Sequence, residues 1–291
     1  MSLLIDTFFA PFGDSPVMRR ALVGVIALSL GAAPMGVLLM LRRMSLMGDA
    51  MAHAMLPGAA IGYAIAGLNF AAMAVGGLFA GFAVALLSGL VARATEIKEE
   101  ASLATFYLIS LALGVAIVSV RGNNDELLHL LFGDVLAMGN SALLLIAFNA
   151  TLTLLTLAVI WRPLVLECVD PLFLRSVSRA GAPVHMLFLA LLTINLVSGF
   201  VALGTLLAVG MMVLPATIAR FWTRDVTAMI GVAAASAMLS GYLGLVLSHR
   251  SGVPPGPSVV LVAAVLAGIS LLFGRAGGLL RQVLPGRHLE A

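Results

Sequence analysis

A carboxylate and an imidazole, Asp49 and His53, stand four residues apart in a stretch that is otherwise almost continuously apolar, MSLMGDAMAHAMLPG at 44–58. Four residues is just over one turn of an α-helix, so both side chains would project from one face and could share a ligand. Carboxylate oxygen and imidazole nitrogen both bind divalent transition metals, and ionisable groups at membrane depth are costly and usually functional. The pair is therefore a candidate metal site. The alternative is that Asp49 caps a helix while His53 bonds to a backbone carbonyl.

The composition indicates that membrane-spanning helices position this pair. Hydrophobic residues make up 62% of the chain and charged residues 10%, whereas about 25% of the residues of a soluble domain are charged. The single cysteine, Cys168, excludes an internal disulfide and a cysteine-based metal cluster. The net charge is +3, but no Lys/Arg cluster is interleaved with aromatic residues, so nucleic acid is not an expected partner. We therefore expect an all-α, polytopic helical membrane protein.

Apolar runs of about 18 or more residues predict nine membrane-spanning helices. They lie at 17–41, 46–66, 70–92, 101–120, 141–160, 183–199, 202–219, 226–247 and 257–273. With the N-terminus outside, twelve Arg and Lys residues fall on the inner side and four on the outer side, as the positive-inside rule requires. Residues 1–291 then form one transmembrane domain, with 1–16 as an interfacial segment and 274–291 as a cytoplasmic tail. A re-entrant helix at 127–138, or a different turn at 199–201, would change the count to eight or ten.

Proline and glycine interrupt three of the predicted helices, at 34–36, at 57–58 and at 210–215. Broken helices are tolerated at membrane depth where the freed backbone groups line a cavity, although packing kinks would explain the same residues. The methionines around Asp49 and His53 are interpreted as packing residues, because methionine is a flexible gap-filler in apolar walls. Small residues such as Gly76, Gly77 and Gly81 predict close helix contacts.

An acidic cluster is predicted near the outer mouth, where it could attract a cation or contact a delivery protein. Its members are Asp125, Glu126, His129 and Asp134. The alternative is an ordinary solvated loop face.

Two inner loops bear on energy coupling. No GxxxxGK[ST] phosphate-binding loop occurs, so any ATPase must be a separate chain. The segment ECVDPLFLRSVSRAG, at 167–181, predicts a short helix with Asp170 as N-cap, Pro171 at its first position and Gly181 as its stop. A second inner loop contains Glu96, Lys98, Glu99 and Glu100. From these residues alone, an ordinary interfacial helix is the preferred explanation of the first loop.

Four segments resemble, in order, the motifs of the permease subunits of the ABC-3 family, the bacterial ABC importers for zinc, manganese and ferrous iron. They are RRMSLMGDAMAHAMLPG at 42–58, LLHLLFGDVLAM at 127–138, the FDPEFA-type loop at 167–181 and LLAVGMMVLPATIAR at 206–220. The resemblance covers residues 18–273 and implies a type II ABC importer permease fold. It also implies that the 167–181 loop docks into a cleft of the ATPase subunit, with Phe173 and Arg175 as contact residues.

The function implied by this resemblance is transport, without enzymatic activity in this chain. Zn²⁺ or Mn²⁺, with ferrous iron as a further candidate, would be the cargo, and no cofactor would be bound permanently. Two permease copies, forming a homodimer or a heterodimer, would work in the bacterial inner membrane with two ATPase subunits, which bind ATP, and an extracytoplasmic metal-binding protein.

Three questions stay open at this point. The metal and the groups that complete its site are undetermined, and Gly252 stands where the family usually carries a carboxylate. An ion-coupled secondary carrier could use the same Asp–His pair without an ATPase. An intramembrane protease is excluded, because neither an HExxH nor a GxSG pattern occurs.

Overall fold

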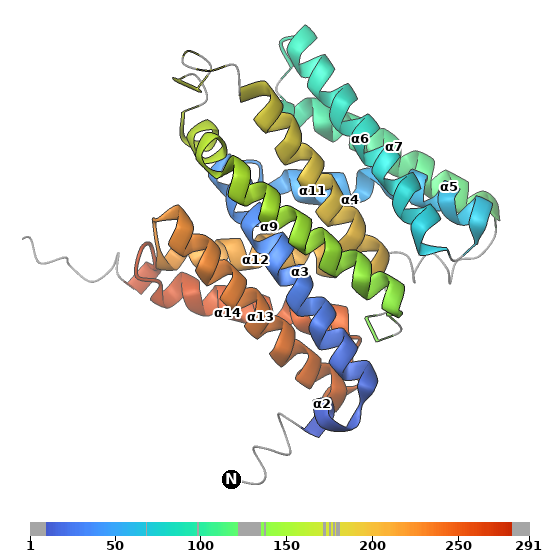
Figure 1. Ribbon diagram of the computed structural model, residues 1–291, viewed down its shortest axis with the longest axis vertical. Helices are drawn as coiled ribbons and strands as arrows, with labels where there is room; N and C mark the ends of the chain where they lie inside the picture. The colour runs from blue at the N-terminus through green and yellow to red at the C-terminus, as the bar shows by residue number, and fades with distance from the viewer. Residues whose placement is uncertain are drawn as a thin grey trace, which may run out of the picture.

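The computed structural model describes residues 10–280, except 68, 98, 122–134, 137, 171–172, 175, 177 and 179–180. All regular secondary structure in this part of the chain is helical (Figure 1). The helices are α2 (Ala10–Asp14), α3 (Pro16–Leu41), α4 (Ser45–Ala54), α5 (Leu56–Ala66), α6 (Phe70–Ala94), α7 (Glu99–Arg121), α9 (Asn140–Val169), α11 (Gly181–Leu203), α12 (Thr205–Trp222), α13 (Val226–Ser251) and α14 (Pro255–Phe273). The prediction of an all-α protein is confirmed.

Polar caps determine where several helices begin. Ser15 accepts a hydrogen bond from the Met18 amide at 3.4 Å, and Pro16 occupies the first helical position of α3. Asp225 caps α13 in the same way, accepting from the Ala228 amide at 2.8 Å. Each cap satisfies an amide that has no partner inside its helix, so these helix starts are encoded locally.

Within the described residues, eight helices are long and apolar enough to cross a membrane: α3, α6, α7, α9, α11, α12, α13 and α14. The chain is therefore a multi-pass membrane protein. The ninth predicted span, 46–66, is divided into two helices, because α4 and α5 meet at Met55, close to the interruption predicted at 57–58. Pro57 lies in the first turn of α5, and a proline has no amide to donate and clashes with the preceding turn.

The other two predicted breaks and the predicted turn need correction. Helix α3 continues through Pro34 and α12 through Pro215, so neither is a break in the helix. The turn predicted at 199–201 lies instead at Gly204, since α11 runs on to Leu203. Gly204 has φ 91°, which side-chain-bearing residues rarely adopt, so the backbone conformation puts the turn at the glycine. The predicted interfacial segment and tail lie partly outside the described residues.

Helix α3 runs through the middle of the bundle (Figure 1). It contacts α9 on one side and α12 and α13 on the other. Helices α5, α6 and α7 form a separate flank, which α11 joins to the centre through its contacts with α6 and α9. Most residues in the apolar stretches of α3 and α11 are buried, whereas fewer than a third of those in α7, α9 and α14 are buried. Helices α3 and α11 therefore connect the α5–α7 flank with the α12–α14 side of the bundle.

Small residues let α5 and α6 approach closely. A Cβ atom at Gly58 would fall on the carbonyl group of Gly76, and one at Gly76 would fall on the carbonyl group of Gly58. The Cβ of an alanine at Gly81 would lie 2.9 Å from the side chain of Thr193 on α11. The prediction of close helix contacts at Gly76 and Gly81 is confirmed, as small residues permit in membrane proteins.

Candidate metal site

The Asp49 and His53 side chains lie on one face of α4, as their spacing predicts. His53 Nε2 is 3.7 Å from Asp49 Oδ1. A tetrahedral metal with ligands at about 2.1 Å would hold two such atoms about 3.4 Å apart. A small side-chain rotation would therefore bring both groups onto one ion.

The alternative roles considered for the pair do not match the structure. Met44 is the N-cap residue of α4, and Asp49 lies more than a turn inside the helix. His53 Nδ1 is buried, and no hydrogen-bond partner reaches it within the described part of the chain. Neither residue is therefore explained by helix capping or by a bond from Nδ1 to a backbone carbonyl.

The two faces of α4 differ sharply. Met47 and Met51 are buried in the core, as the interpretation of the methionines as packing residues requires. The Asp49 side chain is 61% exposed, and it lines an open cavity of about 200 Å³ between α4 and α7. Glu100, predicted in the second inner loop, lies in the first turn of α7 and lines the same cavity.

The pair does not form a complete metal site by itself. Among the described residues, no group of three or more His, Cys, Asp or Glu side chains could hold a metal ion. Water, or groups other than the described His, Cys, Asp and Glu side chains, would have to supply the remaining ligands.

Several predicted site residues lie outside the described part of the chain. They are the outer cluster Asp125, Glu126, His129 and Asp134, together with Lys98, Pro171 and Arg175, and most of the 127–138 segment. The side chain of Glu99 is not described either, and Glu96 is exposed in the turn between α6 and α7.

The segment that joins α9 to α11 begins with the predicted cap. Asp170 Oδ1 accepts a hydrogen bond from the Phe173 amide at 2.9 Å, and the Asp170 carbonyl accepts from the Leu174 amide at 3.2 Å. Leu174 is buried, whereas Phe173 is 51% exposed. Gly181 was predicted to stop the loop helix, but it instead opens α11.

Glycine at position 252 has a conformational explanation. Gly252 ends α13 in the left-handed region with φ 69°, and its amide donates to the Ser248 carbonyl at 3.0 Å. Glycine adopts this helix-ending conformation without strain. The departure from the family pattern thus gives α13 an unstrained C-terminus.

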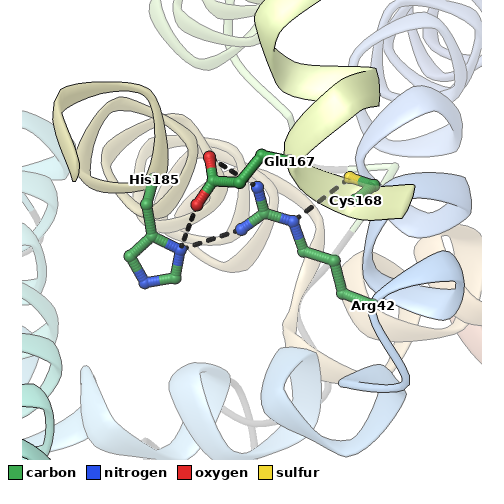
Figure 2. Close-up of polar contacts among 4 residues, drawn as sticks. All are labelled: Arg42, Glu167, Cys168 and His185. Carbon is green, nitrogen blue, oxygen red and sulfur yellow. Dashed lines mark hydrogen bonds and ion pairs between the residues drawn. The ribbon is translucent and has the colours of Figure 1, made fainter. Parts of the chain in front are cut away.

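The structure also gathers four residues that sequence reasoning had left apart (Figure 2). Arg42, at the C-terminal end of α3, donates from Nε to Cys168 Sγ at 3.2 Å and places Nη1 2.9 Å from His185 Nδ1. Its Nη2 lies 3.3 Å from Glu167 Oε2, and Glu167 Oε1 lies 3.6 Å from His185 Nδ1. The guanidinium also lies 4.3 Å from the centre of the Phe188 ring. We call Arg42, Glu167, Cys168 and His185 the inner cluster.

Sequence reasoning missed the inner cluster because it treated each member separately. Arg42 entered only as the first residue of the 42–58 motif, Glu167 as the first residue of the 167–181 loop, and Cys168 as the single cysteine. Glu167 and Cys168 instead belong to the last turns of α9, which extends to Val169 rather than ending at residue 160. A lone carboxylate at the end of an apolar helix was the available signal.

Comparison with known proteins agrees with this geometry along nearly the whole chain. The model of the ABC 3 transport family matches residues 14–274. The manganese transport system membrane protein MntC of Halalkalibacterium halodurans is 30% identical over 97% of this chain and 96% of its own. The probable iron transport system membrane protein of Haemophilus influenzae is 28% identical over 89% of this chain and 94% of its own.

A solved structure, PsaBC from Streptococcus pneumoniae in complex with Fab, superposes with a TM-score of 0.84. The two chains are 27% identical, and the match covers 96% of this chain and 99% of the other. The resemblance seen in the four sequence motifs is confirmed. This chain, with its broken α4–α5 helix and its Asp–His pair, belongs to the ABC 3 transport family.

Proposed function

We propose that this chain is the permease that carries Mn²⁺, with ferrous iron as the second candidate, through a bacterial plasma membrane in an ATP-driven importer. The observation that carries the proposal is the convergence of His53 Nε2 and Asp49 Oδ1 at 3.7 Å on one helix face. Imidazole and carboxylate together suit Mn²⁺, Fe²⁺ and Zn²⁺. Zinc has the weaker support, because the relatives described above are named for manganese or iron.

A transport site must release its ion as well as bind it. Two ligands from one helix, completed by water or by groups from another helix, bind more weakly than a closed site with four protein ligands. Asp49 and His53 are thus suited to be a station on a pathway rather than a structural metal site.

The exposure of Asp49 supports a second permease copy. A carboxylate that faces lipid within a membrane is costly, yet the Asp49 side chain is 61% exposed in the single chain. We therefore place the Asp49 face against a second copy in a homodimer, with the pathway between the two copies.

The energy source is a separate ATPase that docks on the segment between α9 and α11. Phe173 supports this assignment, because it is half exposed while the Asp170 cap and the buried Leu174 hold its backbone in place. An ATPase that binds from the cytoplasm requires this segment to face the cytoplasm, which puts the N-terminus outside and the C-terminus in the cytoplasm. An extracytoplasmic binding protein would then deliver the ion at the outer acidic cluster, 125–134. Membership of an ABC transport family argues against the ion-coupled secondary carrier.

The metal station is tested with Asp49→Asn and His53→Ala in proteoliposomes that contain permease, ATPase and binding protein. Asp49→Asn keeps the side-chain size and removes the charge, so uptake of Mn²⁺ should fall by at least about tenfold, and His53→Ala should match it. Asp225→Asn, which removes an exposed carboxylate far from the pair and keeps a side chain that can cap α13, is the matched control and should transport normally. Normal uptake by both site variants would end the proposal. Elemental analysis of the purified wild-type complex identifies the metal.

The ATPase contact is tested with Phe173→Asp. An unpaired charge at a buried contact costs about 2–5 kcal/mol, so stimulated ATP hydrolysis and uptake should both be lost while the permease still inserts. Phe173→Leu keeps an apolar anchor and should retain most of the activity. Full activity of Phe173→Asp would exclude this segment as the coupling element.

A further inference from the structure

We propose that Arg42 is a coupling residue, which ties both ends of the ATPase-docking segment to the helix that carries Asp49 and His53. Movement of that segment by the ATPase would rearrange the inner cluster and, through Arg42, shift α4. This inference rests on the proposed function, because it assumes that the segment docks an ATPase and that α4 carries the metal pair.

The inner cluster lies where three parts of the chain meet (Figure 2). The docking segment runs from Asp170 to Gly181. Glu167 lies three positions before its start, and His185 lies four positions after its end. Both side chains converge on the guanidinium of Arg42. Any displacement that separates the inner ends of α9 and α11 must therefore break at least one contact to Arg42.

Three nitrogens of one guanidinium are engaged by three different residues on two helices. A planar guanidinium presents its donors in a fixed fork, so its contacts constrain orientation as well as distance. The Phe188 ring, 4.3 Å away, holds the guanidinium on another side. Arg42 thereby sets the position of α3 relative to both α9 and α11.

The inner cluster is buried, but two of its polar atoms lack a hydrogen bond. Such an arrangement is expected of side chains that exchange partners between two states. The side chains of Arg42 and Glu167 are only 7% and 11% exposed. Their facing atoms, Nη2 and Oε2, lie 3.3 Å apart without hydrogen-bond geometry. Apolar residues would stabilise a buried site at least as well as such an ion pair, so static stability alone does not account for this arrangement.

The connection from Arg42 to α4 is short and tightly bonded. The amide of Arg43 donates to the Met40 carbonyl at 3.0 Å, and that of Met44 donates to the Leu39 carbonyl at 2.9 Å. Arg43 has φ 59°, the one positive φ at a non-glycine position among the described residues, which is a strained conformation. Helix α4 begins at Ser45, so no flexible linker separates Arg42 from the helix of the metal pair.

The first test measures coupling in the reconstituted complex of permease, ATPase and binding protein. Arg42→Gln and Glu167→Gln should each lower the number of Mn²⁺ ions transported per ATP hydrolysed by about fivefold or more. The double variant should be no worse than the more affected single variant, because both changes remove one contact. Arg224→Gln, which removes an exposed guanidinium from another inner turn, is the matched control and should keep the normal ratio.

A merely structural role predicts a different result. It would lower transport and ATP hydrolysis in parallel, by reducing the amount of intact complex, and would leave the ratio unchanged; that outcome overturns the proposal. Binding of Mn²⁺ to the nucleotide-free Arg42→Gln complex should equal that of the wild type. Asp49→Asn should lose this binding, because it removes a metal ligand. Binding retained by Asp49→Asn would refute the proposed metal site, and that outcome is distinct from an unchanged transport ratio in Arg42→Gln.

The second test needs no substitution in the inner cluster. Cys168 is the chain's only cysteine, and its sulfur lies 3.2 Å from Arg42 Nε. With cysteine-free partner subunits, the rate at which a thiol reagent modifies Cys168 should rise several-fold when a non-hydrolysable ATP analogue binds. Phe173→Asp should abolish that rise. An identical rate with and without nucleotide in the wild type would refute a rearrangement at the inner cluster.

Discussion

Replacing Gly58 with alanine should separate α5 from α6 and lower the stability of the permease. The added Cβ would fall on the backbone carbonyl of Gly76 and would lie 2.8 Å from the Cβ of Ala80. Carbon atoms in favourable contact are about 3.5–4.0 Å apart, so the two helices must move apart by about 1 Å. No side-chain rotation can relieve the clash, because the main obstacle is backbone.

The size of the effect follows from two opposing terms. Overpacking a tight contact costs about 1–3 kcal/mol, and a rigid backbone obstacle places Gly58→Ala in the upper part of that range. Alanine gains about 1 kcal/mol of helix propensity over glycine. The expected net loss is about 1–2 kcal/mol, or roughly 2–8 °C in Tm for a chain of this size.

Thermal unfolding of the detergent-solubilised permease, followed by size-exclusion chromatography, measures this loss. Gly89→Ala is the matched control, since it lies in α6 and its Cβ would meet nothing within 4 Å. That variant should gain up to about 1 kcal/mol. Equal Tm values for Gly58→Ala and Gly89→Ala would refute the argument from close helix contact. Metal uptake should fall only in Gly58→Ala, because α5 continues directly from the helix that carries the metal pair.

Three further changes test other parts of the fold. Gly204→Ala forces a side chain into φ 91°, ψ 158°, a conformation that is essentially restricted to glycine, and should cost about 1–3 kcal/mol. Gly231→Ala, in open space on α13, should not lower the Tm, and equal losses would contradict the strain argument. Asn195→Ala removes the hydrogen bond that Asn195 donates to the buried Thr153 of α9 at 2.7 Å. The free energy of unfolding should fall by about 0.6–1.7 kcal/mol in the same assay. An unchanged Tm would show that the bond contributes nothing. Cysteines at Ser176 and Asn123, placed singly in a cysteine-free background, should react with an impermeant reagent from opposite sides of the membrane; reaction from one side would disprove the orientation.

Local patterns in the sequence determined much of this structure. The long apolar runs specify spanning helices, since a membrane-embedded backbone must satisfy its own hydrogen bonds. The i, i+4 spacing places Asp49 and His53 on one face of a helix whatever the surrounding fold. Asp170 likewise accepts a hydrogen bond from the Phe173 amide, only three positions further along the chain. Pro57 likewise predicted an interruption at 57–58, and the structure has the break nearby, at Met55.

Only the tertiary structure decided how these local pieces work together. Arg42 reaches Cys168 across 126 positions of sequence and His185 across 143, and no periodicity relates residues so far apart. The meeting of Gly58 with Gly76 likewise depends on how α5 lies against α6. Local spacing constrains only neighbouring turns of one helix. Contacts between helices depend instead on the packing of the whole bundle, which is why the metal pair could be predicted and the inner cluster could not.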